Sequence, residues 1–343
     1  MCFVPCASCF VENKFSPRTK HNAPSTPHQA RAKHPAPSTC EAPRTKHYFI
    51  MKKVLLLGAT GYVGSDFYKL LLERSHNVIR IGRSELEGRS ISELVDSWGS
   101  HAADFLINSA GYTGKPNVDA CELDKANCLY GNAVLPGTIS KVCQQLGLRW
   151  GHVSSGCIFT GRRGDGGGFT ELDSPNFSFR QNNCSFYSGT KALGEEILRD
   201  DPSCFVWRLR IPFSNLDSPR NYLSKVMRYD TLLEAENSLS YLPEFVSACV
   251  DCFSLNAAPG IYNVTNPGAV KTSEVAQMIR NAGLTKKEFR FFETEERFMA
   301  LAAKTPRSNC VMDSSKALAA GLKLRPIEEV LRESLANWCV EGA

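Results

Sequence analysis

Residues 53–64 read Lys53-Val-Leu-Leu-Leu-Gly58-Ala-Thr-Gly61-Tyr-Val-Gly64. The apolar run that ends at Gly58 is typical of a buried parallel strand. Apolar side chains at helical spacing follow over residues 65–74, so the segment predicts a strand, a tight turn and a helix. Glycines in such a turn let the backbone approach a pyrophosphate, which the amino-terminus of the helix then binds. The alternative is a turn that needs glycine only for its own shape.

The rest of the chain continues this alternation of strands and helices. Apolar runs predict strands at 77–81, 104–111, 150–155 and 204–210, and helical spacing predicts helices at 91–98, 121–146 and 186–198. The pattern is that of an α/β doubly wound parallel Rossmann sheet. After residue 212 it loosens, with a strand at 261–264 and helices at 272–282 and 326–340. We predict an NADP-binding domain that carries the catalytic residues at 51–211 and a smaller C-terminal substrate-binding lobe at 212–343.

The second strand indicates the cofactor. It ends in Gly82-Arg83-Ser84, where an enzyme selective for NAD would carry Asp or Glu to bond the ribose hydroxyls. Arg83 instead offers a cation to a 2′-phosphate, and Arg80 could share this role. We therefore expect NADP(H), with NAD(H) as the alternative cofactor. An exposed arginine after a strand is the competing interpretation. The small residues that end the strand at 104–111 should lie against the cofactor.

Tyr187 and Lys191 form a Tyr-x-x-x-Lys pair in the helix at 186–198. Residues four apart are neighbours on a helix face, so the lysine cation should lower the pKa of the phenol toward neutrality. Ser155, which ends the strand at 150–155, could hold a substrate carbonyl beside them. Together the three residues can deliver a proton to a carbonyl oxygen. Asn132 either bonds backbone near this site or is simply polar on its helix.

Composition limits the classes of partner. The chain has 343 residues and a net charge of +5, which equals the charge of residues 1–50 alone. The remainder is neutral, so nothing in it indicates nucleic acid or an anionic membrane. No apolar run approaches the ~20 residues of a membrane span.

The first fifty residues repeat a unit that begins at Arg18, Arg31 and Arg44, rich in Pro, Ser, Thr and Lys. Such a unit cannot bury enough apolar surface to fold, so we expect a disordered, low-complexity extension at 1–50. A cytoplasmic protein with a non-catalytic extension is one interpretation, and an organelle-targeting segment is the alternative. A basic patch for a partner is a third.

Fourteen cysteines are scattered through a long chain without a secretory signal, which indicates reduced thiols. Cys249-Val-Asp-Cys252 is the one Cys-x-x-Cys after residue 50. It falls in a predicted helix without a second pair to complete a zinc site, so we expect no metal.

With these residues assembled, the chain from Met51 onward resembles the extended short-chain dehydrogenase/reductases, and more narrowly the dTDP-4-dehydrorhamnose reductase group. It is most similar to the plant-type bifunctional enzymes that act as epimerase and reductase on a nucleotide 4-keto-6-deoxyhexose. The segments that carry the resemblance are 58–64, 108–122, 155–159, 174–177, 187–191, 208–212, 218–221 with Lys225, 265–268 and 306–309.

The resemblance implies a role for each matching residue. Ser155, Tyr187 and Lys191 would be the reductase triad, and Cys157 and Lys225 the acid/base pair of the epimerase. A small buried side chain at Cys157 and a solvated helix lysine at Lys225 are the competing interpretations. The implied cofactor contacts are Gly58, Gly61, Tyr62, Val63, Gly64, Arg83, Asn108, Ala110, Tyr187, Lys191 and Arg210. The implied substrate contacts are Thr113, Arg220, Asn221 and Arg307.

The expected activity is conversion of a UDP- or dTDP-4-keto-6-deoxyglucose to the L-rhamnose nucleotide with NADPH. The expected partners are the nucleotide sugar and, as an assembly, a homodimer. The alternatives are a reductase that performs no epimerisation and a non-catalytic NADP-binding regulatory subunit of the same fold. The chain departs from the plant pattern at Ser154-Ser155, where alanine and threonine are expected. Either hydroxyl can serve in the triad.

Overall fold

The structure is a computed structural model that describes residues 51–115 and 117–340. These residues form one compact unit. The predicted extension at residues 1–50 lies outside the described residues, and the predicted division at residue 211 stays a prediction. Within the described ranges, no helix has both the length and the apolar character that crossing a membrane requires.

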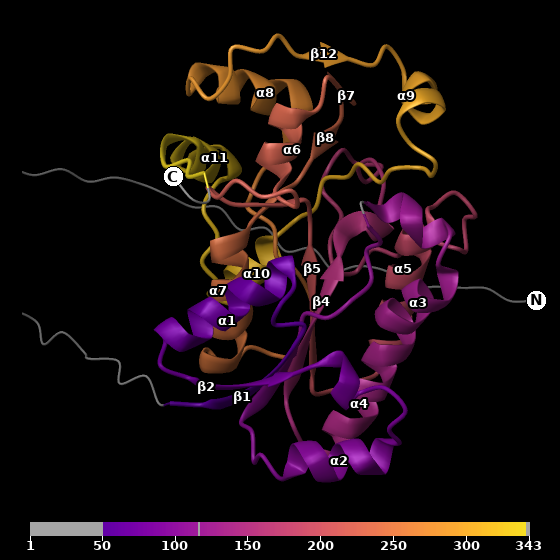
Figure 1. The fold of residues 1–343 in the computed structure, drawn as a ribbon, viewed down its shortest axis with the longest axis vertical. Coiled ribbons are helices and arrows are strands. Elements are labelled where there is room, and N and C mark those ends of the chain that lie inside the picture. Colours follow the sequence, from indigo (N-terminus) through magenta and orange to yellow (C-terminus); the bar gives the residue numbers. More distant parts are fainter. Residues whose placement is uncertain (1–50, 116, 341–343) are drawn as a thin grey trace, which may run out of the picture. The chain divides into compact units, whose positions relative to one another are not determined.

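A six-stranded parallel sheet occupies the centre of this unit (Figure 1). Its strand order is β10-β5-β4-β3-β1-β2, so the chain reverses direction across the sheet between β1 and β3. In a doubly wound sheet, ligands bind beyond the carboxyl ends of the strands at this switch point. The strands are β1 (Lys53–Leu57), β2 (Asn77–Ile81), β3 (Phe105–Asn108), β4 (Trp150–Ser155), β5 (Cys204–Leu209) and β10 (Gly260–Asn263).

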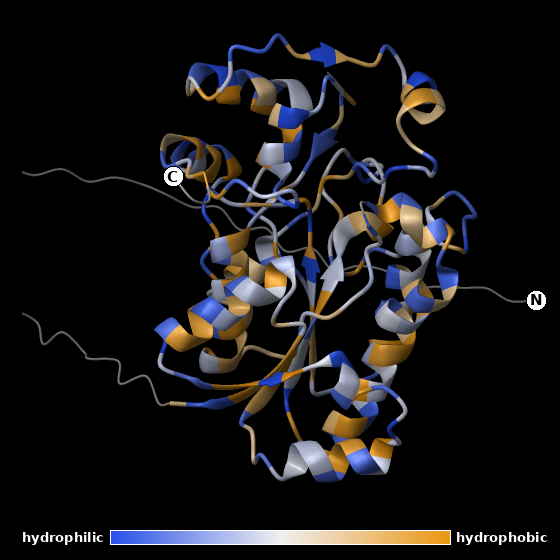
Figure 2. Ribbon diagram, in the orientation of Figure 1, coloured by the Kyte–Doolittle hydropathy of each residue, from blue (hydrophilic) through white to orange (hydrophobic). Residues whose placement is uncertain are grey.

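Helices cover both faces of the sheet because its strands are apolar on both sides. Val54 and Leu56 of β1 pack into one hydrophobic cluster, and Leu55 and Leu57 pack into another. Figure 2 shows the hydrophobic residues of the strands enclosed between helices with mixed surfaces. The α/β Rossmann class is thereby confirmed. One face carries α1 (Tyr62–Glu73), α7 (Leu242–Ser254) and α10 (Ser315–Ala319), and the other carries α2 (Ile91–Gly99), α4 (Leu135–Leu146) and α5 (Phe186–Leu198).

The long helix expected over 121–146 is wrong in its first part. Asp124 has an extended φ of −130° and caps the next helix by accepting a hydrogen bond from the Asn127 amide. The chain before it forms a 3₁₀ turn, and a π-helical turn lies in the middle of the segment. The pieces are η2 (Val118–Glu122), α3 (Lys125–Leu129), η3 (Tyr130–Val134) and α4.

A third hydrophobic cluster joins the elements that follow β5. Its principal helices are α6 (Tyr222–Arg228), α8 (Thr272–Asn281) and α11 (Ile327–Ala336). The last helix ends four residues before its predicted end at Val340. The chain leaves the helix because the Cys339 amide donates to the Asn215 carbonyl and Cys339 forms a β-bridge with Leu216. The remaining elements are η1 (Arg83–Glu85), η4 (Gly156–Ile158), α9 (Glu295–Leu301), β6 (Pro212–Phe213), β7 (Thr231–Leu232), β8 (Glu236–Asn237), β9 (Ser240–Tyr241), β11 (Val270–Lys271) and β12 (Arg290–Phe291).

Candidate active site

The glycine turn after β1 presses against the end of β3. Gly58 has a φ of +77°, and a Cβ on it would lie 2.6 Å from the Ala110 nitrogen. A Cβ on Gly64 would lie 2.0 Å from the Gly58 carbonyl oxygen. Helix α1 begins directly after Gly61, whose lack of a side chain leaves the first amides of the helix without a side-chain cap. This open helix amino-terminus at the switch point fits a diphosphate.

Three predicted cofactor contacts beside this turn make contacts within the protein. Asn108 is fully buried, accepts a hydrogen bond from the Ala110 amide at 3.0 Å and lies 3.0 Å from His152 Nδ1. It therefore fixes the turn after β3, and its role as a cofactor contact stays a prediction. Val63 is half-buried against the hydrophobic core. Tyr62 also packs there, and its buried hydroxyl has no hydrogen-bond partner among the described residues.

Both arginines near the end of β2 are exposed, and they differ in their partners. The Arg80 guanidinium lies over the Tyr68 ring, 5.1 Å from its centroid, and so belongs to the contact between β2 and α1. The Arg83 side chain is 69% exposed and makes a long ion pair of 3.4 Å with Glu87. Exposed pairs of this kind contribute little, so Arg83 can turn toward a phosphate.

Ser155 and Tyr187 come together where β4 ends. The Ser155 hydroxyl accepts a hydrogen bond from the Cys157 amide at 3.2 Å, and it faces the phenol of Tyr187. Ser154 points elsewhere, because its buried hydroxyl donates to Glu195 at 2.6 Å. Of the two adjacent serines, Ser155 therefore lies at the candidate site.

The expected effect of Lys191 on Tyr187 is wrong in this structure. Burial raises the pKa of Tyr187 above its ordinary value, and charge on Cys157 raises it further, while the contact with Ser155 opposes the rise only in part. Lys191 is buried, and its ammonium donates to the Val153 carbonyl at 3.3 Å. Burial also lowers the pKa of Lys191. Desolvation is thus the largest effect on the pKa of the phenol.

Asn132 connects the π-helical turn to this site. Its amide oxygen accepts from the Tyr112 amide at 3.0 Å, and its amide nitrogen donates to the Tyr112 carbonyl at 2.9 Å and to Thr190 at 3.2 Å. A Cβ on Gly111 would lie 3.2 Å from Asn132 Oδ1 and 3.3 Å from Lys191 Nζ. Asn132 therefore bonds backbone near the site, as the first interpretation predicted. Nothing in the helical spacing could have shown the π turn that directs it there.

Cys157 lies two residues after Ser155, in the turn η4, and is 7% exposed. It belongs to a small buried cluster, and the Tyr187 ring packs against that cluster. Burial raises the pKa of the Cys157 thiol, while Ser155, Ser188, Arg210 and Lys191 lower it. The thiol and the phenol thus meet on one side of the fold. The cluster contains Cys157, Ile158, Phe159, Phe169, Ala192, Cys310 and Met312.

Arg210 lies beside this cysteine, in the residue after β5. The prediction made it a cofactor contact. In the structure it is buried, and its Nη2 donates to Asn237 and to the Ser308 carbonyl, both at 2.5 Å. These bonds hold the guanidinium inside the protein, near Cys157.

Lys225 and two predicted substrate residues lie near one another. Arg220 donates to the Thr113 hydroxyl at 2.8 Å, and this joins the loop before α6 to the segment after β3. Lys225, on α6, is half-buried, and both burial and the nearby Arg220 lower its pKa. Arg210 and Lys191 are the cations that lower the pKa of Cys157, and Lys225 is not among the groups that shift it.

The other two predicted substrate contacts are occupied within the protein. Asn221 is fully buried, caps α6 and donates to the Ser214 and Leu216 carbonyls at 2.8 and 2.6 Å. These hydrogen bonds order the loop, and the role of Asn221 as a substrate contact stays a prediction. Arg307 forms a two-pronged ion pair with Asp119, with both bonds between 2.7 and 2.8 Å.

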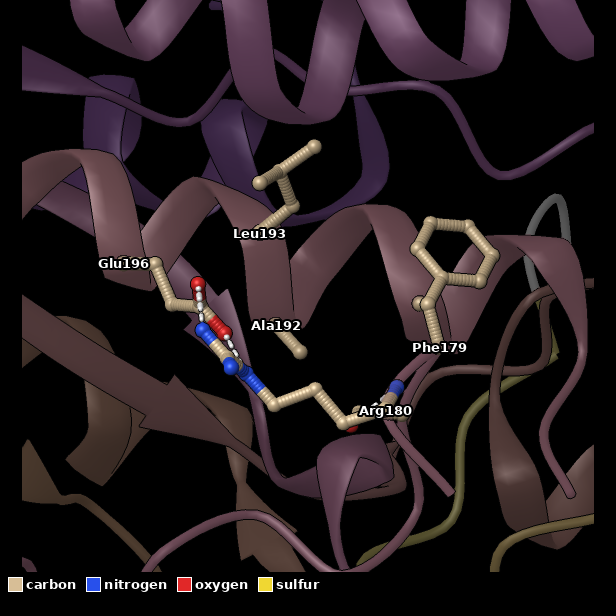
Figure 3. Close-up of a pocket in the computed structure, with 7 residues that line it drawn as sticks. Phe179, Arg180, Ala192, Leu193 and Glu196 are labelled. Carbon is tan, nitrogen blue, oxygen red and sulfur yellow. Dashed lines mark hydrogen bonds and ion pairs between the residues drawn. The ribbon is translucent and has the colours of Figure 1, made fainter. Parts of the chain in front are cut away.

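A shallow pocket of about 190 Å³ lies on the opposite face of α5 (Figure 3). The Arg180–Glu196 ion pair crosses it, and Phe179 and Leu193 lie beside it. Gly189, Ala192, Leu193 and Glu196 line it, whereas Tyr187 and Lys191 project from the other side of the helix. We assign it no role in the chemistry.

Residues 51–339 match the family described as the RmlD substrate binding domain. The chain belongs to this family. The expected membership of the dTDP-4-dehydrorhamnose reductase group is confirmed. In this RmlD-family chain, the match includes the glycine turn, the Tyr187 helix and the elements that follow β5.

Relatives of this RmlD-family chain include two plant enzymes from Arabidopsis thaliana. One is a bifunctional dTDP-4-dehydrorhamnose 3,5-epimerase/reductase, 34% identical over 81% of this chain and 90% of its own length. The other is a trifunctional UDP-glucose 4,6-dehydratase, 3,5-epimerase and reductase, 35% identical over 81% of this chain. The chain spans about two fifths of that longer relative.

Solved structures share the fold. The L780 UDP-rhamnose synthase of Acanthamoeba polyphaga mimivirus superposes with a TM-score of 0.76 at 24% identity, over 84% of this chain and 99% of its own. A dTDP-4-dehydrorhamnose reductase from Bacillus anthracis, in complex with NADP, superposes with a TM-score of 0.69 at 18% identity, over 84% of this chain and 99% of its own.

Proposed function

We propose that the chain is an NADPH-dependent enzyme that epimerises C3 and C5 of a UDP- or dTDP-4-keto-6-deoxyglucose and then reduces C4 to give the L-rhamnose nucleotide. One observation carries the proposal: Ser155, Cys157 and Tyr187 meet at the end of β4 around the same small buried cluster. The plant relatives at 34 and 35% identity are named for both activities. A thiol beside the proton donor is what distinguishes this site from a plain reductase site.

The glycine turn would hold the cofactor. The close approach of Gly58 to Ala110 and the uncapped start of α1 fit the diphosphate, and Arg83 fits a 2′-phosphate. Lys191 and Asn132 approach Gly111 from the other side and would support the nicotinamide end. When bound, NADPH supplies the hydride for the carbonyl carbon.

Tyr187 would supply the proton in the reduction. Because burial raises its pKa, the phenol stays protonated throughout the neutral range. It can therefore donate a hydrogen bond to the C4 oxygen and give up the proton as negative charge develops there. The Ser155 hydroxyl, which already faces the phenol, would hold the same oxygen. In this proposal, two hydroxyl donors would act on one carbonyl oxygen.

Cys157 and Lys225 would exchange protons at the carbons next to the ketone. These hydrogens become acidic when Tyr187 and Ser155 stabilise the enolate oxygen. The Cys157 thiolate would remove the proton from one face. Lys225 would return one to the other face, and its lowered pKa makes its ammonium a better donor than an ordinary lysine.

Incubation with UDP-4-keto-6-deoxyglucose and NADPH in deuterated water tests the proposal. The rhamnose product should carry deuterium at both C3 and C5. Cys157→Ser should lose both labels and still reduce the pre-epimerised ketosugar, because the hydroxyl is too weak a base. Cys310→Ser, a second buried cysteine of the same cluster that bonds the Gly156 carbonyl at 3.3 Å, is the matched control and should keep both labels.

Two results would contradict the proposal. Unlabelled product from the wild-type chain, formed only from pre-epimerised substrate, would indicate a reductase without epimerase activity. Absence of NADPH oxidation with either ketosugar would favour a regulatory NADP-binding subunit.

A further inference from the structure

Arg210 is a buried cation that has no carboxylate partner among the described residues. It is 5% exposed, and its Nη2 is held by the Asn237 side chain and the Ser308 carbonyl. Its Nε is buried without a hydrogen-bond partner in the part of the chain that the structure describes. Within residues 51–115 and 117–340, no Asp or Glu forms an ion pair with it. A buried charge is costly unless an opposite charge or a full set of hydrogen bonds accompanies it.

The nearby acid does not compensate Arg210. Glu195 is bound by Arg208, with Nη2 to Oε2 at 2.8 Å and Nε to both oxygens at 3.0 and 3.1 Å. It also accepts the hydrogen bond of Ser154. This buried pair is neutral as a unit, so the cations of Arg210 and Lys191 remain in excess around the cluster.

The Arg210 side chain runs along the loop that carries Cys157. A Cβ on Gly156, the residue before Cys157, would lie 3.4 Å from Arg210 Cδ. Asn237 holds this arrangement from the other side, because its Oδ1 accepts both from Arg210 and from the Cys310 amide at 3.0 Å. Cys310 in turn donates to the Gly156 carbonyl. The guanidinium is therefore fixed relative to the thiol.

Four groups of the surrounding elements bear on the charge of Cys157. Lys191 of α5 and Arg210 after β5 favour the thiolate. Tyr187 of α5 and Cys184, just before that helix, disfavour it when they are ionised. With Tyr187 protonated as the proton donor, the balance of these charges is positive. The group that can supply the missing negative charge is Cys157 itself.

We propose that Arg210 is a positioning residue whose fixed charge stabilises the thiolate form of Cys157 when the thiol gives up its proton for the epimerisation. The inference rests on the proposed function, since it explains how a thiol this buried can act as a base near neutral pH. No bond to the substrate is required of Arg210. The charge of its guanidinium, held in place by Asn237 and Ser308, is sufficient to stabilise the Cys157 thiolate.

The test measures ionisation of Cys157 without using turnover. The full chain is alkylated with iodoacetamide from pH 6 to pH 10, and the rate at Cys157 is followed by peptide mass spectrometry. Each rate is normalised to its own plateau, so limited access to the thiol cancels. In Arg210→Met the midpoint should move up by about one pH unit, a roughly tenfold lower rate at pH 7. Arg210→Lys should restore most of the shift, because the charge returns.

Controls separate this effect from general disruption. The exposed Cys339 serves as an internal reference in the same digests and should not move. Arg74→Met removes another partly buried arginine, which pairs with Asp251 on α7, and should leave the Cys157 midpoint unchanged. If circular dichroism shows that Arg210→Met does not fold, Arg210→Gln replaces it and keeps a donor for the Ser308 carbonyl.

An unchanged midpoint in folded Arg210→Met or Arg210→Gln would overturn the inference, even if the wild-type chain introduces deuterium at C3 and C5. So would a shift that Arg210→Lys fails to reverse, since the effect would then be steric. A shifted midpoint in a chain that introduces no deuterium would instead overturn the proposed function and leave the electrostatic role of Arg210 standing. The two failures are thus distinguishable.

Discussion

In the proposed mechanism, reduction depends on the phenol of Tyr187. Tyr187→Phe removes its hydroxyl and keeps the ring that packs against the Cys157 cluster. NADPH oxidation with pre-epimerised ketosugar should fall by about 10²–10⁴-fold, the range of a lost general acid. Tyr229→Phe, the same change at a tyrosine that is 53% exposed, should leave the rate unchanged. Steady-state absorbance measurements decide, and equal rates in the two variants would refute the role.

Proton abstraction needs Cys157 as a thiolate, whereas reduction needs Tyr187 in its protonated form, so the two reactions should have different pH profiles. Burial raises the pKa of the Cys157 thiol, so the thiolate fraction, and with it deuterium exchange into the substrate, should rise up to about tenfold per pH unit below that pKa. Burial also raises the pKa of Tyr187, so the proton donor remains protonated and reduction should stay nearly flat from pH 6 to pH 8. Exchange and reduction measured separately across this range would check both slopes. An exchange rate independent of pH would contradict the thiolate base.

At the scale of single residues, the patterns of two segments predicted Ser155, Tyr187 and Lys191 as site residues, and the family resemblance added Cys157. It assigned Arg210, Asn108 and Asn221 to ligands, although their partners hold them inside the protein. The partners of Arg210 are Asn237 and Ser308, 27 and 98 residues away. No local spacing encodes such contacts. Sequence alone therefore cannot tell whether a polar residue of a family motif binds a ligand or supports the fold.

Among the elements, the turn between β1 and α1 gives the sharpest prediction. Gly58→Ala must meet the Ala110 backbone in addition to adopting a left-handed φ. It should weaken NADPH binding at least tenfold, because the turn can no longer close against β3. Gly147→Ala at the end of α4 has a similar φ of +61° but nothing within 4 Å, so it isolates the backbone strain. That variant should lose about 1 kcal/mol of stability and keep its affinity.

Calorimetric titration with NADPH and thermal unfolding of both variants would separate the two effects. Equal loss of affinity in Gly147→Ala would contradict the close-approach argument.

The segment 118–146 shows that hydrophobic periodicity cannot distinguish one long helix from several shorter helical pieces. An α turn and a π turn share almost the same apolar spacing, so the sequence indicated one long helix. The structure interrupts it at Asp124 and widens it around Asn132. The hydrogen bonds from Asn132 to Tyr112 and Thr190 connect the widened turn to the rest of the fold. Those contacts, made across 20 and 58 residues, select the π turn and are invisible to periodicity.

For the whole molecule, every candidate site residue lies between Gly58 and Arg307. A chain that begins at Met51 should therefore keep the kinetic constants of the full chain within about twofold, since residues 1–50 supply no predicted site residue. Parallel measurement of kcat and KM for the two proteins tests this. A loss of activity in the shortened protein, with an unchanged circular dichroism spectrum, would give the extension a role in turnover.

The fold class followed from the sequence because a sheet covered on both faces needs strands that are mostly apolar and buried on both sides, and β1, β3 and β5 are. The elements after β5 were less predictable. Their strands are only two residues long, apart from β10, and depend on partners far along the chain. The bridges from Gly161 to Cys310 and from Phe169 to Met312 are of this kind.

These bridges have a consequence for synthesis of the protein. The wall around Cys157 is completed by Cys310 and Met312, and the bond from Cys310 to Gly156 spans 154 positions. A nascent chain must therefore expose this nucleophilic sulfur to the surrounding solution until almost the whole polypeptide has left the ribosome. Oxidants and electrophiles too bulky to reach the sulfur in the folded protein can react with it during that interval, and a ribosome that stalls late would prolong the exposure.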